Sequence, residues 1–243
     1  MVKPAAPNPI DAAGTDEATW ASWPALGRLP AAPITDWASA VVLAAHPDDE
    51  VLGVGGIMSV LASAGARLRL VAVTDGEASH PGHAEPGALA QRRVAETAEA
   101  LRVLGAQPTE VIRLRLPDTG VAEREDEVTG LLRDLVGGFD VCLAPWQQDM
   151  HADHEVVGRS ARRASPRTMF YPIWMWHWAF PGDPRVPWDR GVRVPLPPEV
   201  AARKRAAIGC FASQLERRGP GLEPVLPPGA VAHFTRGQEV LFR

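Results

Sequence analysis

From about residue 37 onward, short apolar runs alternate with longer amphipathic stretches. The runs at 41–45, 68–74 and 139–144 consist mainly of apolar residues. Nearly continuous apolar runs of this length are typical of strands that are buried on both faces. The run at 111–116 alternates apolar residues with arginine, which predicts a half-buried strand.

The stretches between these runs carry apolar residues at helical spacing. Val94, Ala98 and Leu101 fall on one face of a predicted helix, and Gly105 supplies its end. The predicted helices span about 56–62, 88–104, 121–136, 155–164 and 198–214. Strands that alternate with helices indicate parallel βαβ units. The sequence therefore predicts an α/β fold with a mostly parallel sheet flanked by helices.

The last third of the chain has a different pattern. Residues 169–178 are dense in aromatic side chains, and a strand there would place Trp174, Trp176 and Trp178 on one side. Such a row either belongs to the core or lines a pocket for a sugar, whose apolar C–H faces pack well on aromatic rings. Trp174 and Trp176 are therefore candidate substrate contacts. A final strand is predicted at 239–242.

Residues 1–37 are rich in Ala, Pro, Asp and Thr, which predicts a partly ordered N-terminal arm. Trp20 and Trp23 in this arm suggest that part of it packs on the body of the protein. Residues 38–243 are long enough for one α/β domain with a well-buried core.

Composition and charge exclude several classes of protein. The formal net charge is -4 without a cluster of Lys and Arg, which argues against a nucleic-acid partner. Cys142 and Cys210 resemble small buried hydrophobic residues rather than a disulfide framework. We find neither a secretory signal pattern nor an apolar stretch of the ~20 residues that a membrane span needs. A cytoplasmic protein is therefore expected.

Polar residues with metal-binding chemistry follow two of the predicted strands. The motif His46-Pro47-Asp48-Asp49-Glu50 comes directly after the run at 41–45, and His151-Ala152-Asp153-His154 follows the run at 139–144. In parallel sheets, ligands bind beyond the carboxyl ends of the strands. The sequence therefore predicts a metal site at this edge of the sheet.

The spacing within the two motifs suggests a role for each residue. Zinc in hydrolases usually takes three protein ligands and keeps one position for water. His46 and Asp49 are three residues apart, as suits a tight turn, and His154 would complete the ligand set. Asp48 would then be the general base for the reactive water. His151 would face the developing oxyanion, and Asp149 or Asp153 would keep it charged.

These motifs resemble the PIG-L/LmbE family of zinc-dependent N-deacetylases. Further stretches that fit are Thr74-Asp75-Gly76-Glu77, Arg92-Arg93 with Glu96, Leu104-Gly105, Lys204, Ala207 and Ser213-Gln214. The resemblance implies a Rossmann-like fold, zinc bound by His46, Asp49 and His154, and an N-acetylated amino sugar or glycoconjugate as substrate. It implies the same roles for Asp48 and His151, and makes Arg93 and Asp75 candidate contacts to substrate hydroxyls. Ala152 departs from the pattern, since the family commonly has proline there.

Three other interpretations remain open at this point. A metal-dependent phosphoesterase would use two metals, with Glu50 and Asp153 as additional ligands. A non-catalytic sugar-binding protein would retain the fold without the reaction. A nucleotide-dependent oxidoreductase is disfavoured because Gly53-Val54-Gly55-Gly56 lacks the full dinucleotide-binding spacing.

Zinc is the expected metal, although His/Asp sites accept other divalent transition metals. The long loop at 75–88 is of the kind that forms lids.

Overall fold

The computed structural model describes residues 9–80, 85–218 and 221–243. Residues 1–8 of the predicted arm and residues 81–84 of the predicted lid loop lie outside these described residues. The strands form one seven-stranded sheet in the order β3-β2-β1-β4-β5-β7-β6. Their bounds are β1 Ser39–Ala44, β2 Arg67–Thr74, β3 Thr109–Leu116, β4 Val141–Pro145, β5 Thr168–Tyr171, β6 Gly191–Pro195 and β7 Gln238–Phe242.

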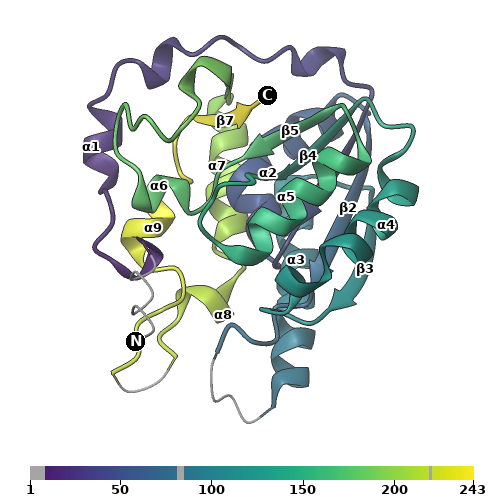
Figure 1. Cartoon of the computed structure of the whole chain (residues 1–243). Coiled ribbons are helices and arrows are strands. Elements are labelled where there is room, and N and C mark those ends of the chain that lie inside the picture. The colour runs from purple at the N-terminus through teal and green to yellow at the C-terminus, as the bar shows by residue number, and fades with distance from the viewer. Residues whose placement is uncertain (1–8, 81–84, 219–220) are drawn as a thin grey trace, which may run out of the picture.

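Two layers of helices cover the sheet. The helices are α1 Glu17–Ala21, α2 Asp49–Ser63, α3 Pro86–Leu104, α4 Glu125–Val136, α5 Ala152–Ala164, α6 Met175–Trp178, α7 Pro198–Ile208, α8 Ala212–Leu215 and α9 Pro228–Ala232. Helices α2, α3 and α7 pack together on one face, and α4 and α5 pack together on the other (Figure 1). Strands β1 to β5 are parallel to one another, and β7 runs antiparallel to β5 and β6. The predicted mostly parallel α/β fold is confirmed. Within the described part of the chain, every helix is too short or too polar to cross a membrane.

The order of the strands creates a switch point beside β1. This strand pairs with β2 on one side and with β4 on the other, both in parallel. All six residues of β1 and all five of β4 are buried, as their apolar runs predict. The chain leaves the carboxyl ends of these two neighbouring strands toward opposite faces of the sheet, through α2 and α5. Such a point is where open α/β sheets bind their ligands.

Both predicted metal motifs lie partly inside helices rather than in loops. Asp49 is the first residue of α2 and Asp48 is its N-cap, while His151 is the N-cap of α5 and His154 lies in its first turn. Acidic residues in a first turn are favoured by the partial positive charge of a helix N-terminus. The helices begin earlier than predicted for this reason.

The aromatic segment was wrongly predicted as a continuous strand. Strand β5 ends at Tyr171, and the chain then turns into the short helix α6. The buried carboxylate of Asp149 causes this turn, because it accepts hydrogen bonds from the N–H groups of Ile173, Trp174 and Met175 at 2.9–3.1 Å. The predicted helix at 198–214 is likewise divided, into α7 and α8.

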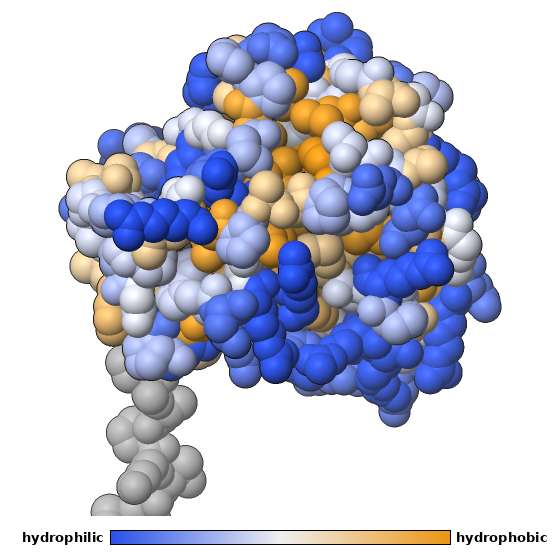
Figure 2. All heavy atoms as spheres, turned by 90° about the horizontal axis from the view of Figure 1, so that it is seen from above, coloured by the Kyte–Doolittle hydropathy of each residue, from blue (hydrophilic) through white to orange (hydrophobic). Residues whose placement is uncertain are grey.

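The described part of the N-terminal segment packs on the body of the protein. Trp20 is fully buried, and its indole N–H donates to the carbonyl of Trp176 at 2.8 Å. The ring of Trp20 also meets the rings of Trp23 and Trp188 with centroids 6.1 and 5.9 Å away. Seen from above, hydrophobic residues gather toward the middle of the molecular surface and hydrophilic residues surround them (Figure 2).

Candidate metal centre

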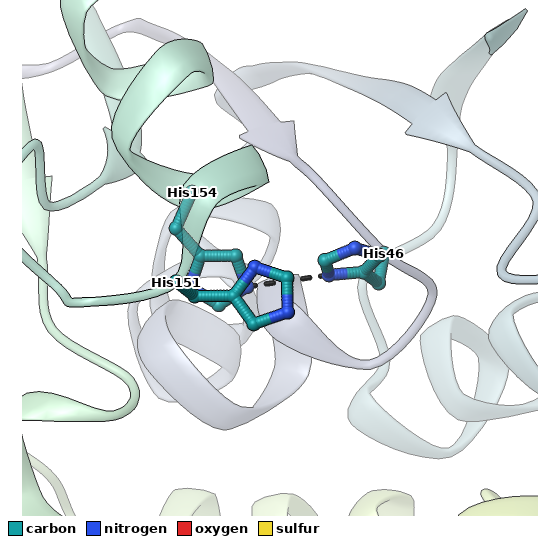
Figure 3. A group of neighbouring side chains, drawn as sticks. All are labelled: His46, His151 and His154. Atoms are coloured by element: carbon teal, nitrogen blue, oxygen red, sulfur yellow. Dashed lines mark hydrogen bonds between the residues drawn. The ribbon is translucent and has the colours of Figure 1, made fainter. Parts of the chain in front are cut away.

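Three side chains that could bind a metal ion converge at the switch point. The Nδ1 atom of His46, which follows β1, lies 3.2 Å from the Nε2 atom of His154 in α5 (Figure 3). The carboxylate of Asp49 lies 3.3 Å from the same His154 nitrogen and 3.6 Å from Nδ1 of His46. A tight turn holds the pair, because the backbone N–H of His46 donates to Asp49 at 2.8 Å.

These separations fit a single bound metal ion. Zinc bonds to nitrogen and oxygen ligands are ~2.0–2.2 Å long, so two ligands of a tetrahedral zinc stand roughly 3.3–3.6 Å apart. The three side chains are 12%, 3% and 1% exposed in the order His46, Asp49, His154, so water competes little for them. The residues present therefore fit a zinc ion or a similar divalent cation.

Carboxylates contact the second ring nitrogen of both candidate ligand histidines. Nδ1 of His154 lies 2.8 Å from Asp149, and Nε2 of His46 lies 3.2 Å from Asp118 and 3.3 Å from Asp153. A histidine ligand usually donates its second ring N–H to a carboxylate, which leaves the first nitrogen free for the metal. Sequence reasoning missed Asp118. Its position just after β3, a third strand end, was the available signal.

Charge is concentrated in this cluster. Although burial acts to lower the pKa of His46, its bonds to Asp118, Asp153 and Asp49 raise that pKa well above its usual value. Burial also acts to lower the pKa of His154, but the charge of Asp49 and the hydrogen bond to Asp149 raise this pKa to about 9. The opposite holds for Asp49. Burial acts to raise its pKa, but the charge of His154 lowers this pKa well below the usual range. A cation bound here would take the place of these protons.

His151 lies against the two ligand histidines. Its ring centroid is 4.8 Å from that of His46 and 4.5 Å from that of His154. One ring nitrogen from each of the three imidazoles lies within 4.8 Å of the others, so these histidines form a second possible set of metal ligands. Burial, with the charges of His154 and His46, lowers the pKa of His151 to about 3.

The predicted partners of His151 bind other residues. Asp149 is bonded to His154, and Asp153 contacts His46 and accepts the N–H of Thr119 at 3.0 Å. The charge of Asp153 acts to raise the pKa of His151, but burial and the charges of His154 and His46 outweigh it. Among the described residues, the buried Nδ1 of His151 has no hydrogen-bond partner.

Asp48 occupies a strained position beside the ligands. Its φ is 127°, a region that is rare for residues other than glycine and is often found at functional sites. The Arg93 guanidinium holds it there, at 3.3 Å from the Asp48 carboxylate and 2.6 Å from the carbonyl of Pro47. Burial outweighs the charge of Arg93 and raises the pKa of Asp48 to about 7. A general base works best with a pKa near the working pH.

Glu50 lies behind Asp48. It is fully buried, and its carboxylate accepts the backbone N–H of Asp48 at 3.2 Å. Burial raises the pKa of Glu50 to about 8. A neutral Glu50 supports the loop without adding a further negative charge to the cluster.

A small pocket opens beside His46, Asp49 and His154. Its volume is about 130 Å³, and besides the residues above its wall includes Ser79, Trp174 and Gln214. Pockets for whole drug-sized ligands are usually ~300–1,000 Å³. The pocket therefore suits one reacting group of a larger molecule, whose remainder would lie outside it.

The predicted substrate contacts divide into two groups. Trp174 and Arg93 line this pocket. The carboxylate of Asp75 instead forms an ion pair with Arg113, with bonds of 2.7 and 2.5 Å, and lines a separate pocket. Trp176 is buried in the core, with the guanidinium of Arg236 4.0 Å from its ring centre. A contact from Asp75 or Trp176 to a molecule at the ligand group is not supported by these positions.

Comparison with solved structures shows the same fold in deacetylases. The N,N'-diacetylchitobiose deacetylase from Pyrococcus horikoshii superposes with a TM-score of 0.56 at 22% identity, over 73% of this chain and 71% of that one. The A40926 pseudoaglycone deacetylase superposes with a TM-score of 0.62 at 17% identity, over 84% of this chain and 95% of that one. At these identities the likeness concerns the fold alone.

Sequence comparison gives a closer relationship over a shorter stretch. A 1D-myo-inositol 2-acetamido-2-deoxy-alpha-D-glucopyranoside deacetylase from Kineococcus radiotolerans is 42% identical over 66 residues, 25% of this chain and 18% of that protein. The chain spans about a quarter or less of the length of the curated relatives it matches. Residues 41–165, which contain both metal motifs, match the family described as PIG-L, GlcNAc-PI de-N-acetylase. The chain therefore belongs to the PIG-L family.

Proposed function

We propose that the protein is a metal-dependent hydrolase that removes the acetyl group, or another acyl group, from an N-acylated amino sugar or its conjugate. One observation carries this proposal. The Nδ1 of His46, the carboxylate of Asp49 and the Nε2 of His154 lie 3.2–3.6 Å apart in a chain of the PIG-L family. The deacetylases among its relatives support the choice of an amide as the bond that is cleaved.

His46, Asp49 and His154 would hold the metal, with zinc as the expected ion. A divalent cation in this position lowers the pKa of a water ligand and polarises a carbonyl group. Asp48, whose pKa lies near 7, accepts a proton from the attacking water and then returns it to the leaving amine. Arg93 fixes the Asp48 carboxylate for both transfers.

His151 has a place beside the carbonyl that is attacked. Its low pKa in the metal-free protein means that the ring is neutral before substrate binds. A neutral imidazole can still donate one N–H to the negative oxygen that develops on the acyl group, and removal of such a donor often costs ~3–4 kcal/mol. Trp174, on the pocket wall, is the expected platform for the sugar ring.

The test is release of a primary amine from N-acetylglucosamine conjugates. Metal-loaded wild-type protein should release the amine, and Asp48→Asn should bind metal as well as wild type while its rate falls roughly 10²–10⁴-fold. His154→Ala should lose the metal. Amine release that survives undiminished in Asp48→Asn would remove Asp48 from the role of base.

Two other functions make different predictions in the same experiment. A non-catalytic sugar-binding protein would bind the conjugates without releasing amine. A phosphoesterase would bind two metal ions per chain and would cleave phosphate esters. The buried group formed by His46, Asp118 and Asp153 is where a second cation would have to bind. A metal content of one per chain would therefore exclude the two-metal mechanism.

A further inference from the structure

Helix α2, which carries Asp49, is interrupted at Val54. The φ and ψ of this residue are -140° and 18°, outside the helical region, so residues 49–53 form a first turn apart from the rest of the helix. An interruption frees backbone groups on both sides. In a continuous helix the N–H of Gly56 would donate to the carbonyl of Leu52.

Two side chains from the last third of the chain bind these groups. The carboxylate of Glu239, in β7, accepts the N–H of Gly56 at 2.7 Å and that of Ile57 at 2.8 Å. The ammonium of Lys204, in α7, donates to the carbonyl of Leu52 at 2.8 Å. The two side chains also form an ion pair at 2.6 Å. The pair therefore replaces the helical hydrogen bond that is interrupted.

Burial lowers the pKa of Lys204, and the charge and hydrogen bond of Glu239 act against this effect. Lys204 is 3% and Glu239 is 1% exposed, and buried ions are tolerated when their remaining hydrogen bonds are satisfied. Here each ion has a backbone partner as well as the opposite charge. The carboxylate lies at the N-terminus of the second helical segment and the ammonium at the C-terminus of the first turn. Both positions complement the helix dipole.

The glycines of α2 provide the space for this arrangement. A Cβ atom on Gly56 would lie 2.5 Å from the side chain of Leu196 and 3.0 Å from the Glu239 carboxylate, and one on Gly53 would lie 2.2 Å from the ring of Tyr171. The hydroxyl of Tyr171 in turn donates to the carbonyl of Leu43 in β1 at 2.6 Å. The first turn is therefore packed tightly against a ring that is fixed to the central strand.

This first turn carries much of the candidate site. Asp48 is its N-cap, Asp49 is its first residue, and Leu52 lines the pocket. Arg93 binds the chain just before the turn, through the Pro47 carbonyl. The ion pair binds the chain at the end of the turn, so the turn is held at both ends.

We propose that Lys204 and Glu239 are positioning residues: by holding the break in α2 they orient its first turn so that Asp49 faces the metal and Asp48 faces the substrate. The inference rests on the proposed function, because it assigns Asp49 and Asp48 those roles. It extends the site beyond residues 41–165, the range that matches the family. The last third of the chain then completes the metal site without contributing a ligand.

The test uses two variants and a matched control. Lys204→Met combined with Glu239→Gln removes both charges and keeps an acceptor oxygen for only one of the two helix N–H groups, because an NH₂ group takes the place of the other oxygen. Glu239→Asp keeps both charges, but its shorter side chain cannot hold both N–H groups in the same geometry. The control is Asp183→Asn, since Asp183 is also fully buried and forms an ion pair at 2.6 Å, with Arg185, outside the candidate site.

The readout is binding of cobalt(II), whose visible absorption reports the geometry of its ligands. Both test variants should bind cobalt about 10–100-fold more weakly than wild type and should show a changed absorption band, because disturbed support for a ligand typically has this effect. Their kcat should fall more than their KM rises. The control should keep the wild-type affinity and band even if its thermal midpoint falls.

Wild-type affinity and absorption in both test variants would overturn the inference, even if their thermal midpoints fall. If the double variant does not fold, Glu239→Asp decides alone. Failure of the proposed function has a different signature. A wild-type protein that binds cobalt but releases no amine from acylated amino sugars would refute the activity, while the cobalt titrations would still decide the role of the ion pair.

Discussion

Replacement of Asp149 by Asn tests how the site selects the metal-binding form of His154. One carboxylate oxygen of Asp149 accepts the N–H groups of Ile173 and Met175, and the other accepts that of Trp174 and contacts Nδ1 of His154 at 2.8 Å. Asn can keep the first oxygen, but it puts an NH₂ group in the place of the second. That group donates, so it would favour the tautomer of His154 whose Nδ1 accepts and whose Nε2 carries the proton.

The size of the effect follows from these bonds. A proton on Nε2 of His154 would block the atom proposed to bind the metal, and loss of such a supporting carboxylate typically lowers metal affinity 10–100-fold. The Trp174 N–H is left facing another donor. An unsatisfied buried group of this kind lowers the free energy of unfolding by about 1–3 kcal/mol.

Two measurements separate these effects. Zinc affinity is obtained by competition with a chelator, and the free energy of unfolding of the metal-free protein is obtained from urea titration. Asp183→Asn is the control, because Asp183 is equally buried and accepts a backbone N–H at 3.0 Å outside the site. A zinc affinity within twofold of wild type in Asp149→Asn, with the expected loss of stability, would refute the argument that Asp149 sets the tautomer of a ligand.

Three further outcomes are expected. The folded pKa of Glu50 is raised from 4.5 to about 8, so the folded metal-free protein binds this proton more tightly than the unfolded chain, and stability falls as the pH rises from 4.5 to 8. Glu50→Gln should remove this part of the decline in the free energy of unfolding, which is on the order of 3–5 kcal/mol. Urea titrations of wild type and Glu50→Gln over this pH range check this, and an equal decline in both proteins would contradict it. Trp20→Ala should lower the free energy of unfolding by about 3–5 kcal/mol and leave zinc affinity unchanged, since Trp20 is fully buried but lies outside the pocket. Trp174→Ala should raise KM for an N-acetylglucosamine conjugate about 2–10-fold, as expected for loss of an aromatic platform. Asp75→Asn should change KM little because Asp75 is paired with Arg113. Equal effects of the two changes on KM would show that the substrate pocket has been assigned to the wrong residues.

The sequence alone determined the fold class and the residue types at the centre of the site. The apolar runs of β1 and β4 are long enough and continuous enough to specify strands buried on both faces. His46 and His154 follow these runs closely, so their convergence depends only on the two strands being parallel neighbours. Local patterns were sufficient here because each candidate ligand lies in the connection after a strand or in the first turn of the helix that follows it.

The tertiary structure alone decided which groups contact the candidate ligands. Asp118 contacts His46 from the loop after β3, and Asp149 contacts His154 from five residues earlier, and periodicity predicts neither side-chain bond. The aromatic segment becomes a helix beyond Tyr171 because Asp149, about 25 residues earlier, binds three of its N–H groups. Lys204 and Glu239 reach α2 from the last third of the chain. Such contacts depend on where the folded chain brings residues that are distant in the sequence, and local patterns carry no information on that.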